Sequence, residues 1–494
     1  MDRAVFPMKL NNADLLRSQS FLNGKWVDGQ DGATFAVDNP ATGAHIAHVA
    51  NLGAAQAQVA IEAASAAFPA WRARTAKERS IILRKWFDLI NANTDDLARI
   101  MTIEQGKPFA EAKGEIAYGA SFVEWFAEQA KRVMGDTISA PIATNRMLVL
   151  REPIGVCAAI TPWNFPIAMI TRKVAPALAA GCTIVLKPAE QTPLSALALA
   201  VLAEQAGIPA GVLNILTADS EQSIAIGKVL CNSPIVRKLT FTGSTPVGRI
   251  LMQQSAQTLK KMSLELGGHA PFIVFEDADI DAAIEGAMVS KYRNAGQTCV
   301  CTNRFYVHAK VYDSFAEKLA ARVSGSLFVG EGFEDKVTTG PLIDEAAVAK
   351  VEEHVQDAVA KGAKILCGGA KHARGGRFYQ PTVITQVKED MLCMREETFG
   401  PLAPIVKFTD EAEVIRLANN TDYGLASYFY SRDIGRIFRV AEALEYGMVG
   451  VNTGLISNEM APFGGVKQSG LGREGSVYGM DDFMEMKYVC LGGI

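Results

Sequence analysis

The chain has 494 residues, which is too many for one ordinary core, and with 49% hydrophobic and 21% charged residues it has the composition of a folded globular protein rather than a disordered one. Its formal net charge of -4, with acids and bases interspersed, argues against a nucleic-acid partner and a basic membrane-binding face. No apolar run approaches the roughly 20 residues that span a bilayer and no secretory signal pattern is seen, so we expect a cytoplasmic protein.

Short strands precede a long helical region in the first part of the chain. Residues 21–29 and 33–50 combine strand-like segments with Gly and Pro turns, which predicts small antiparallel strands. From about residue 54 to residue 131, apolar residues recur every three or four positions, which predicts helices. The segment MLVLREP, from Met147, predicts a strand that closes this part.

Strands and helices alternate through the rest of the chain. After Gly155, the apolar segments GVCAAITPW, CTIVLKPA, VLNILT, VRKLTFTG and KMSLELGG are separated by helical stretches, which predicts a doubly wound parallel sheet. A second α/β unit should run from Gly267 to about Gly470. The last segment, MEMKYVCLGGI, predicts an apolar strand with no partner nearby in the sequence, and another subunit could cover its edge.

The eight cysteines are too sparse for a disulfide framework, which belongs to short secreted domains. No C-x-x-C occurs, and His269 and His308 have no second Cys or His at metal-ligand spacing, so no metal site is expected. His45 and His48 lie in a segment that alternates like a strand, so their imidazoles should face opposite ways and be structural. Six cysteines stand singly and are expected to be reduced thiols that fill core space: Cys157, Cys182, Cys231, Cys367, Cys393 and Cys490.

Two loops at strand ends have features of a dinucleotide site. In FTGSTPVG, Gly243 allows a tight turn, while Thr245 and Pro246 suit the N-cap and the first helical position. Such a helix N-terminus can bind pyrophosphate, although the turn is not a G-x-G-x-x-G fingerprint and alone fits an ordinary connection. In KPAEQTP, Lys187 can donate to hydroxyl groups and Glu190 can accept from a ribose diol. Two such loops on successive strands favour a dinucleotide site.

The stretch NAGQTCVC places Cys299 among small residues and free backbone N–H groups. A nucleophilic cysteine needs its thiolate, access for the substrate and donors for the oxyanion formed on attack. Asn164 of TPWNFP could donate to that oxyanion, and Glu265 of ELGG precedes two glycines that let an acid move. Taken singly, each residue has an ordinary explanation: Cys299 could be a buried cysteine, Asn164 a turn residue and Glu265 a surface glutamate.

Together, the motifs TPWNFP, KPAE, FTGSTPVG, LELGG, NAGQTC, EETFGP and PFGGVKQSGLGRE resemble the aldehyde dehydrogenase superfamily in order and spacing, over essentially the whole chain. Within it, PWNFPIAMITRKVAPALAAGCT, GQTCVC and PFGGVKQSGLGREGS look like the succinate-semialdehyde dehydrogenases. The resemblance implies an α/β fold with a Rossmann-like cofactor domain (1–131 and 153–266), an α/β catalytic domain (267–477) and a small β oligomerisation arm (132–152 and 478–494). It also implies a homodimer or homotetramer.

The resemblance assigns the chemistry as follows. Cys299 would attack the aldehyde, the side-chain amide of Asn164 and the backbone N–H of Cys299 would hold the oxyanion, and hydride would pass to the nicotinamide. Glu265 would activate the water that hydrolyses the thioester. Lys173 and Glu474 match positions that support a proton relay in some relatives.

The implied cofactor is NAD, with NADP possible. Glu190, if it accepts from both ribose hydroxyls, would repel a 2′-phosphate, but some relatives in this subgroup carry a small residue there and accept NADP. The implied contacts are Lys187 and Glu190 at the adenosine ribose, Ser244 beside Gly243 at the pyrophosphate, Glu397 at the nicotinamide ribose, and Trp163 and Phe399 flanking the cofactor.

The substrate implied by the subgroup is an aldehyde with an ω-carboxylate, succinate semialdehyde. Arg172 and Arg293 would bind the carboxylate, with Ser457 as a third donor. Glutarate semialdehyde is one methylene longer, which a pocket discriminates by only about 1–3 kcal/mol. A CoA-acylating dehydrogenase and a non-enzymatic binding protein are further alternatives. The presence of Glu265 argues against the first, and the presence of Cys299 argues against the second.

Cys301 has two interpretations. It is either a small filler beside the site or a thiol that resolves an oxidised, low-pKa Cys299 through a strained, easily reduced C-x-C disulfide.

Overall fold

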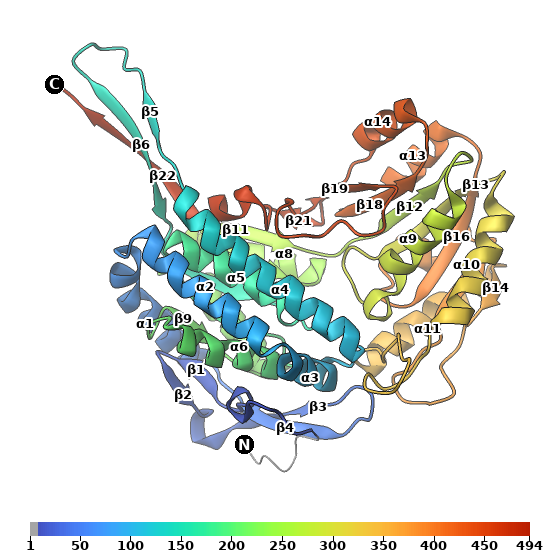
Figure 1. The fold of residues 1–494 in the computed structure, drawn as a ribbon, viewed down its shortest axis with the longest axis horizontal. Coiled ribbons are helices and arrows are strands. Elements are labelled where there is room, and N and C mark those ends of the chain that lie inside the picture. Colours follow the sequence, from blue (N-terminus) through green and yellow to red (C-terminus); the bar gives the residue numbers. More distant parts are fainter. Residues whose placement is uncertain (1–7) are drawn as a thin grey trace.

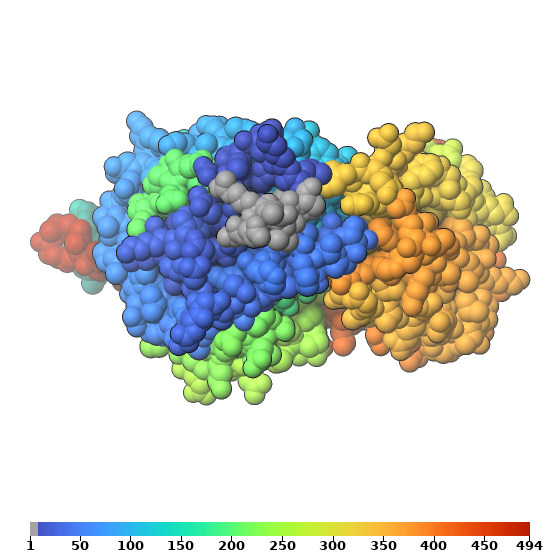
Figure 2. Space-filling view, turned by 90° about the horizontal axis from the view of Figure 1, so that it is seen from below, coloured from blue at the N-terminus to red at the C-terminus, as the bar shows by residue number. Residues whose placement is uncertain are grey.

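Two α/β lobes and a projecting three-stranded arm make up the protein in a computed structural model that describes residues 8–494 (Figure 1). Residues 1–7, which begin the predicted cofactor domain, lie outside the described residues. Seen from below, the arm and the second lobe extend from opposite sides of the first lobe (Figure 2).

The first lobe is built on an eight-stranded sheet of order β2-β1-β9-β8-β7-β10-β11-β21. The five strands from β9 to β11 are parallel, with β1–β2 and β21 antiparallel at the edges. From β7 the chain adds β8 and β9 on one side, then β10 and β11 on the other, which confirms the doubly wound sheet. The strands are β1 (Ser20–Leu22), β2 (Lys25–Val27), β7 (Val156–Ile160), β8 (Thr183–Lys187), β9 (Leu213–Ile215), β10 (Val236–Thr242), β11 (Lys261–Glu265) and β21 (Gly470–Leu471).

The helices of this lobe agree with the predicted periodicity. Thr75 and Glu78 form a capping box that begins α2, and Gly106, at φ 93°, ends α3 in the left-handed conformation that glycine favours. Helices α2, α4 and α5 run side by side (Figure 1), and every residue of α5 is buried. The helices are α1 (Ala54–Arg72), α2 (Ala76–Ala92), α3 (Thr94–Gln105), α4 (Phe109–Gln129), α5 (Ala168–Ala180), α6 (Pro193–Ala206), α7 (Ser220–Asn232) and α8 (Thr245–Ser255).

The second lobe is a seven-stranded sheet of order β14-β15-β16-β13-β12-β18-β19, parallel except for β14. Its strands are β12 (Ala270–Val274), β13 (Thr302–His308), β14 (Lys364–Cys367), β15 (Thr382–Thr385), β16 (Leu402–Phe408), β18 (Ala426–Tyr430) and β19 (Met448–Val451). Its helices are α9 (Ile280–Tyr292), α10 (Tyr312–Ser326), α11 (Glu345–Ala360), α12 (Leu392–Arg395), α13 (Glu411–Asn419) and α14 (Ile434–Ala443). A short pair, β17 (Tyr423–Gly424) and β20 (Val466–Lys467), completes it.

The arm joins β5 (Asp136–Ile138), β6 (Arg146–Pro153) and β22 (Met484–Leu491). The C-terminal strand β22 pairs with β6 along its whole length, from Met484 opposite Pro153 to Leu491 opposite Arg146. Its partner is therefore a distant segment of the same chain, which leaves other faces of the arm exposed.

Two local predictions are wrong. His45 and His48, in β4 (His45–Ala50), are both exposed with ring centroids 6.0 Å apart, because the register with β3 (Thr34–Asp38) shifts beside Val37 and breaks the alternation. Cys490 is exposed on β22 and Cys367 is only half-buried, whereas the other four isolated cysteines are buried.

Residues 8–494 contain no group of three or more His, Cys, Asp or Glu side chains placed to hold a metal ion. Over the same residues, none of the helices has the length and apolar character needed to cross a membrane.

Candidate active site

A cavity of about 230 Å³ lies where the two lobes meet, at the carboxyl ends of β7, β10 and β11. The strand order reverses between β7 and β10, and such switch points are where open α/β sheets bind ligands. Loops from the second lobe, before β13 and before β16, close the other side. The cavity brings together seven predicted site residues, Trp163, Asn164, Gly243, Ser244, Cys299, Glu397 and Phe399, with Pro162, Thr242, Leu266 and Gly267.

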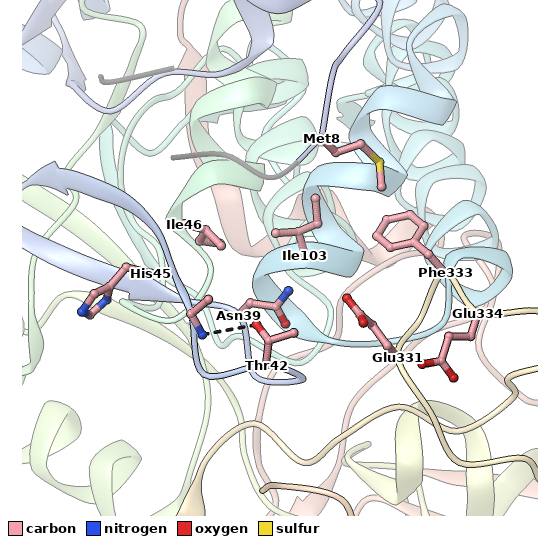
Figure 3. A pocket seen from close by; sticks show the side chains of 10 residues that line it. Met8, Asn39, Thr42, His45, Ile46, Ile103, Glu331, Phe333 and Glu334 are labelled. Carbon is pink, nitrogen blue, oxygen red and sulfur yellow. Dashed lines mark hydrogen bonds between the residues drawn. The ribbon is translucent and has the colours of Figure 1, made fainter. Parts of the chain in front are cut away.

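A larger cavity, of about 490 Å³, lies elsewhere and contains none of the predicted site residues (Figure 3). Apolar side chains of Met8, Ile103 and Phe333 and the carboxylates of Glu331 and Glu334 line it. Its lining includes His45 but no cysteine.

The loop of Cys299 is held in an unusual backbone conformation. Asn294 and Ala295 have φ values of 51° and 54°, in the left-handed region that non-glycine residues rarely adopt. A Cβ added to Gly268 would lie 2.3 Å from the Cys299 carbonyl oxygen, so only glycine permits the segment between β11 and β12 to approach the Cys299 loop this closely. The close packing leaves the thiol half-buried at the cavity wall.

Burial raises the pKa of the Cys299 thiol to about 12, and the carboxylates of Glu397 and Glu265 act in the same direction. Arg172 lowers it, but not enough to compensate. The expectation of a low-pKa thiolate is therefore wrong for this state of the protein. The thiol is protonated at neutral pH, and its attack on a carbonyl requires a proton acceptor.

Asn164 faces the same cavity from the loop between β7 and α5. Its Nδ2 donates to the carbonyl oxygen of Gln297 at 3.1 Å, and its Oδ1 accepts from the N–H of Phe165 at 3.1 Å. An amide nitrogen carries two hydrogens, so one remains for a ligand in the cavity. The arrangement can thus present an oxyanion donor beside the thiol of Cys299.

Glu265 ends β11 but does not line the cavity. It is 2% exposed, and neither carboxylate oxygen has a hydrogen-bond partner within residues 8–494. Burial raises its pKa well above the ordinary value, Glu474 adds to the effect, and Arg172 and Lys173 oppose it. Glu265 consequently keeps its proton to higher pH than an exposed carboxyl does, and it must turn to reach the cavity as a base.

Glu474 joins two predicted residues in one buried ion cluster. It accepts from Lys173 Nζ and pairs with Arg172 Nε. Burial opposes ionisation of Glu474, but the two cations lower its pKa, while burial lowers the pKa of Lys173. The charges of this cluster also act on Glu265, although no hydrogen bond joins Glu265 to it within residues 8–494.

The three predicted carboxylate-binding residues all act on the pKa of one residue that the sequence did not reveal. Burial raises the pKa of the Tyr118 hydroxyl, whereas Arg172, Arg293 and Ser457 lie close enough to lower it. Arg172 Nη1 has no hydrogen-bond partner among the described residues. Tyr118 comes from α4, in the segment EIAYGASFVEWF, where an aromatic residue fits a core position and gives no functional signal.

The cavity also has the features expected of a nicotinamide site. Glu397 Oε1 accepts from the N–H of Gly268 at 3.0 Å, and burial raises its pKa to about 7. Trp163 and Phe399 meet edge to face, with centroids 5.7 Å apart. At the start of α8, the N-cap is exposed Ser244 rather than Thr245 as predicted, and no side chain caps it. The first N–H groups of α8 are therefore available to an anion.

Lys187 and Glu190 lie apart from this cavity, at the end of β8, where their side chains are 3.3 Å apart. Burial lowers the pKa of Lys187, and Glu190 opposes the shift. Glu190 lines a separate cavity of about 260 Å³ that also contains Asp219 and Glu104. Since β8, β7, β10 and β11 are neighbours in order, the two cavities suit the two ends of a dinucleotide laid across the sheet, and the residues fit NAD or NADP.

Cys301 is 1% exposed and does not line the cavity of Cys299. Lys291 Nζ donates to its sulfur at 3.4 Å, and the thiol is 3.3 Å from the Lys291 carbonyl oxygen. Its redox role stays a prediction.

Comparisons with known proteins give a consistent picture. The family model described as aldehyde dehydrogenase family matches residues 26–489. A glutarate-semialdehyde dehydrogenase of Pseudomonas aeruginosa is 64% identical, covering 99% of this chain and 100% of the relative. The NADP(+) succinate-semialdehyde dehydrogenase GabD of Escherichia coli K12 is 61% identical, covering 98% and 100%. The crystal structure of a succinate-semialdehyde dehydrogenase from Burkholderia pseudomallei superposes with a TM-score of 0.97 at 64% identity, over 98% of this chain and all of that one.

Proposed function

The chain belongs to the aldehyde dehydrogenase family, and we propose that within it the chain oxidises succinate semialdehyde to succinate. The observation that carries the proposal is the cavity in which the Cys299 thiol and the Asn164 amide stand together at the switch point of the sheet. Arg172, Arg293 and Ser457, which all lower the pKa of the Tyr118 hydroxyl, support binding of a carboxylate-bearing substrate.

In the proposed reaction, Cys299 Sγ attacks the aldehyde carbon, and its proton passes to solvent water as the bond forms, because the thiol is protonated at rest. Asn164 Nδ2 and the backbone N–H of Cys299 hold the oxygen that becomes negative. Bound NAD(P) supplies the acceptor for the aldehyde hydrogen. Glu265, once turned and deprotonated, takes a proton from the water that hydrolyses the thioester, and passes protons to the Lys173–Glu474 pair.

The ω-carboxylate is proposed to bind Arg172, Arg293 and Ser457, with the Tyr118 hydroxyl as a further donor. Arg172 Nε pairs with Glu474, which fixes the side chain, while Arg172 Nη1 has no other partner within residues 8–494. The guanidinium is therefore held in place and still has a donor for the substrate carboxylate. Glutarate semialdehyde is the second candidate, because one relative at 64% identity has that name and one methylene changes binding by only about 1–3 kcal/mol.

The family uses NAD or NADP. We infer a preference for NAD, because Glu190 lines one cavity with the carboxylate of Asp219, where a 2′-phosphate would meet like charge. Lys187 Nζ, directed at Glu190, is placed to orient that carboxylate toward a ribose diol.

The proposed cofactor domain comprises 1–131 and 153–266, the catalytic domain 267–477, and the oligomerisation arm 132–152 and 478–494. Exposed apolar side chains on the arm, among them Ile138, Met486 and Tyr488, support a role in joining subunits into a dimer or tetramer.

A cytoplasmic location is proposed because all eight cysteines are free thiols, as in a reducing compartment.

A panel of aldehydes with and without an ω-carboxylate, each run with NAD and with NADP, tests this function. We expect the highest kcat/KM with succinate semialdehyde and NAD, and a lower value with the uncharged aldehyde of equal length. Product formation only with added coenzyme A would identify an acylating enzyme instead. Reduction of no cofactor by any aldehyde would contradict the catalytic proposal.

A further inference from the structure

A buried lysine and glutamate at the corner between α3 and α4 contact the loop that carries Asn164. Lys107 lies in the linker between the two helices, and Glu115 lies on the second turn of α4. Their side chains are each 1% exposed and form a salt bridge. Neither lines the cavity of Cys299, so their connection to the chemistry is indirect.

Lys107 fixes the backbone of the oxyanion residue. Its Nζ donates to the carbonyl oxygen of Asn164 at 2.8 Å and lies 4.1 Å from the centroid of the Phe165 ring. The Nδ2 of Asn294 donates to the same carbonyl at 3.0 Å. Two donors thus hold the peptide after Asn164, and so set the direction in which its side-chain amide points.

Glu115 fixes the other end of the same loop. Its Oε1 accepts from the N–H groups of Ile167 at 2.9 Å and Ala168 at 3.3 Å, where α5 begins. Ile167 is the N-cap of α5 and makes no side-chain cap, so a carboxylate from α4 replaces one. Because α5 carries Arg172 and Lys173, the same contact also orients their helix.

The corner reaches the nucleophile loop as well. Glu111 Oε2 accepts from the N–H of Asn294 at 2.9 Å, and Gln105 Nε2 donates to Asn294 Oδ1 at 3.1 Å. Asn294 has the left-handed φ of 51°, a conformation that persists only where surrounding contacts hold it.

We propose that Lys107 and Glu115 are positioning residues for the oxyanion site, which set the Asn164 amide against the carbonyl attacked by Cys299. The proposal rests on the proposed roles of Asn164 and Cys299. It assigns the segment EQGKPFAEAKGE a function in catalytic geometry in addition to packing.

The test compares two reactions of the Cys299 thiol in the cofactor-free protein. Acylation by p-nitrophenyl acetate passes through an oxyanion, whereas alkylation by iodoacetamide does not. The double variant Lys107→Met/Glu115→Gln removes both charges together, since a lone buried carboxylate would destabilise the fold, and the amide oxygen introduced by Glu115→Gln can still accept from the N–H of Ile167. We expect acylation to slow about 10- to 100-fold while alkylation stays within about 3-fold.

Asp96→Asn is the matched control. Asp96 is also buried on α3 and accepts from two backbone N–H groups, of Asn11 at 3.1 Å and Asn12 at 2.7 Å, but contacts neither active-site loop. It should lower the melting temperature without changing the ratio of acylation to alkylation.

An unchanged ratio in the folded double variant would overturn the proposal, as would an equal fall in both rates, which indicates general distortion. If the double variant does not fold, Lys107→Leu/Glu115→Leu decides, because apolar side chains of similar volume often replace a buried ion pair without loss of stability, and a ratio equal to that of the parent overturns the proposal. A parent that reacts with the ester but does not oxidise succinate semialdehyde would refute the proposed substrate and leave this inference standing. A parent that is alkylated at Cys299 but never acylated would refute both.

Discussion

The raised pKa of Cys299 leads to a quantitative prediction for the cofactor-free protein. With a pKa of about 12, roughly 1 thiol in 10⁵ is ionised at pH 7, against roughly 1 in 30 for free cysteine with a pKa of about 8.5. The more basic thiolate is intrinsically about 30-fold more nucleophilic over this interval. The ionised fraction differs about 3000-fold, so Cys299 should react with iodoacetamide about 100-fold more slowly than free cysteine at pH 7.

The sign of the pH dependence follows from the same pKa. Deprotonation increases with pH, so the alkylation rate of Cys299 should rise about tenfold per pH unit from pH 6 to pH 10, whereas free cysteine levels off above about pH 9. The measurement is the carbamidomethylated fraction of the peptide containing Cys299, by mass spectrometry, with N-acetylcysteine as a reference thiol. A plateau below pH 9, or a rate at pH 7 equal to that of the reference, would refute the argument that burial by two lobes keeps this thiol protonated.

Four further predictions concern individual side chains. Glu265→Gln should leave a rapid first turnover of reduced cofactor but lower steady-state kcat by about 10²-fold or more, because only the deacylation base is lost; normal steady-state turnover would contradict the base role. Arg293→Leu should raise KM for succinate semialdehyde about 10- to 100-fold, and Tyr118→Phe should raise it about 3- to 10-fold. Neither variant should change KM for propanal much, and an equal effect on both aldehydes would show that these residues are structural. Glu190→Ser should raise kcat/KM with NADP relative to NAD by about tenfold or more, measured by initial rates, and an unchanged ratio would count against Glu190 as the discriminating group. Cys301→Ala should keep its activity but recover less fully than the parent when a dithiol follows mild peroxide, and equal recovery would leave Cys301 as packing alone.

The order of elements could be predicted from the sequence because the relevant signals are local. Apolar residues at three- and four-residue spacing between 54 and 131 correspond to α1–α4, and the apolar segments after Gly155 correspond to the strands from β7 to β11. The alternation of strands with helices was enough to predict the doubly wound sheet. The motif around Cys299 and its companions identified the aldehyde dehydrogenase family, since seven short stretches in one order are specific even where each is weak.

Other features depended on segments that meet only after folding. The partner of β22 is β6, which lies far away in the sequence, and a register shift near Val37 turned His45 and His48 to the same side. The N-cap of α8 is Ser244, one residue before the predicted Thr245, and the preceding strand ends at Thr242.

The electrostatics of the site likewise could not be predicted from the sequence, because desolvation depends on which lobes close over a group. Burial raises the pKa of both Cys299 and Glu265, although their motifs suggest a thiolate and a carboxylate. Tyr118, Lys107 and Glu115 look like ordinary residues of an amphipathic region, and only the folded chain brings Tyr118 under the influence of Arg172 and joins Lys107 and Glu115 to the loop that carries Asn164. The order of residues was enough to identify the reactive side chains and the protein family. The packing of the folded chain determined the protonation of these side chains, their hydrogen-bond partners and the residues that surround them.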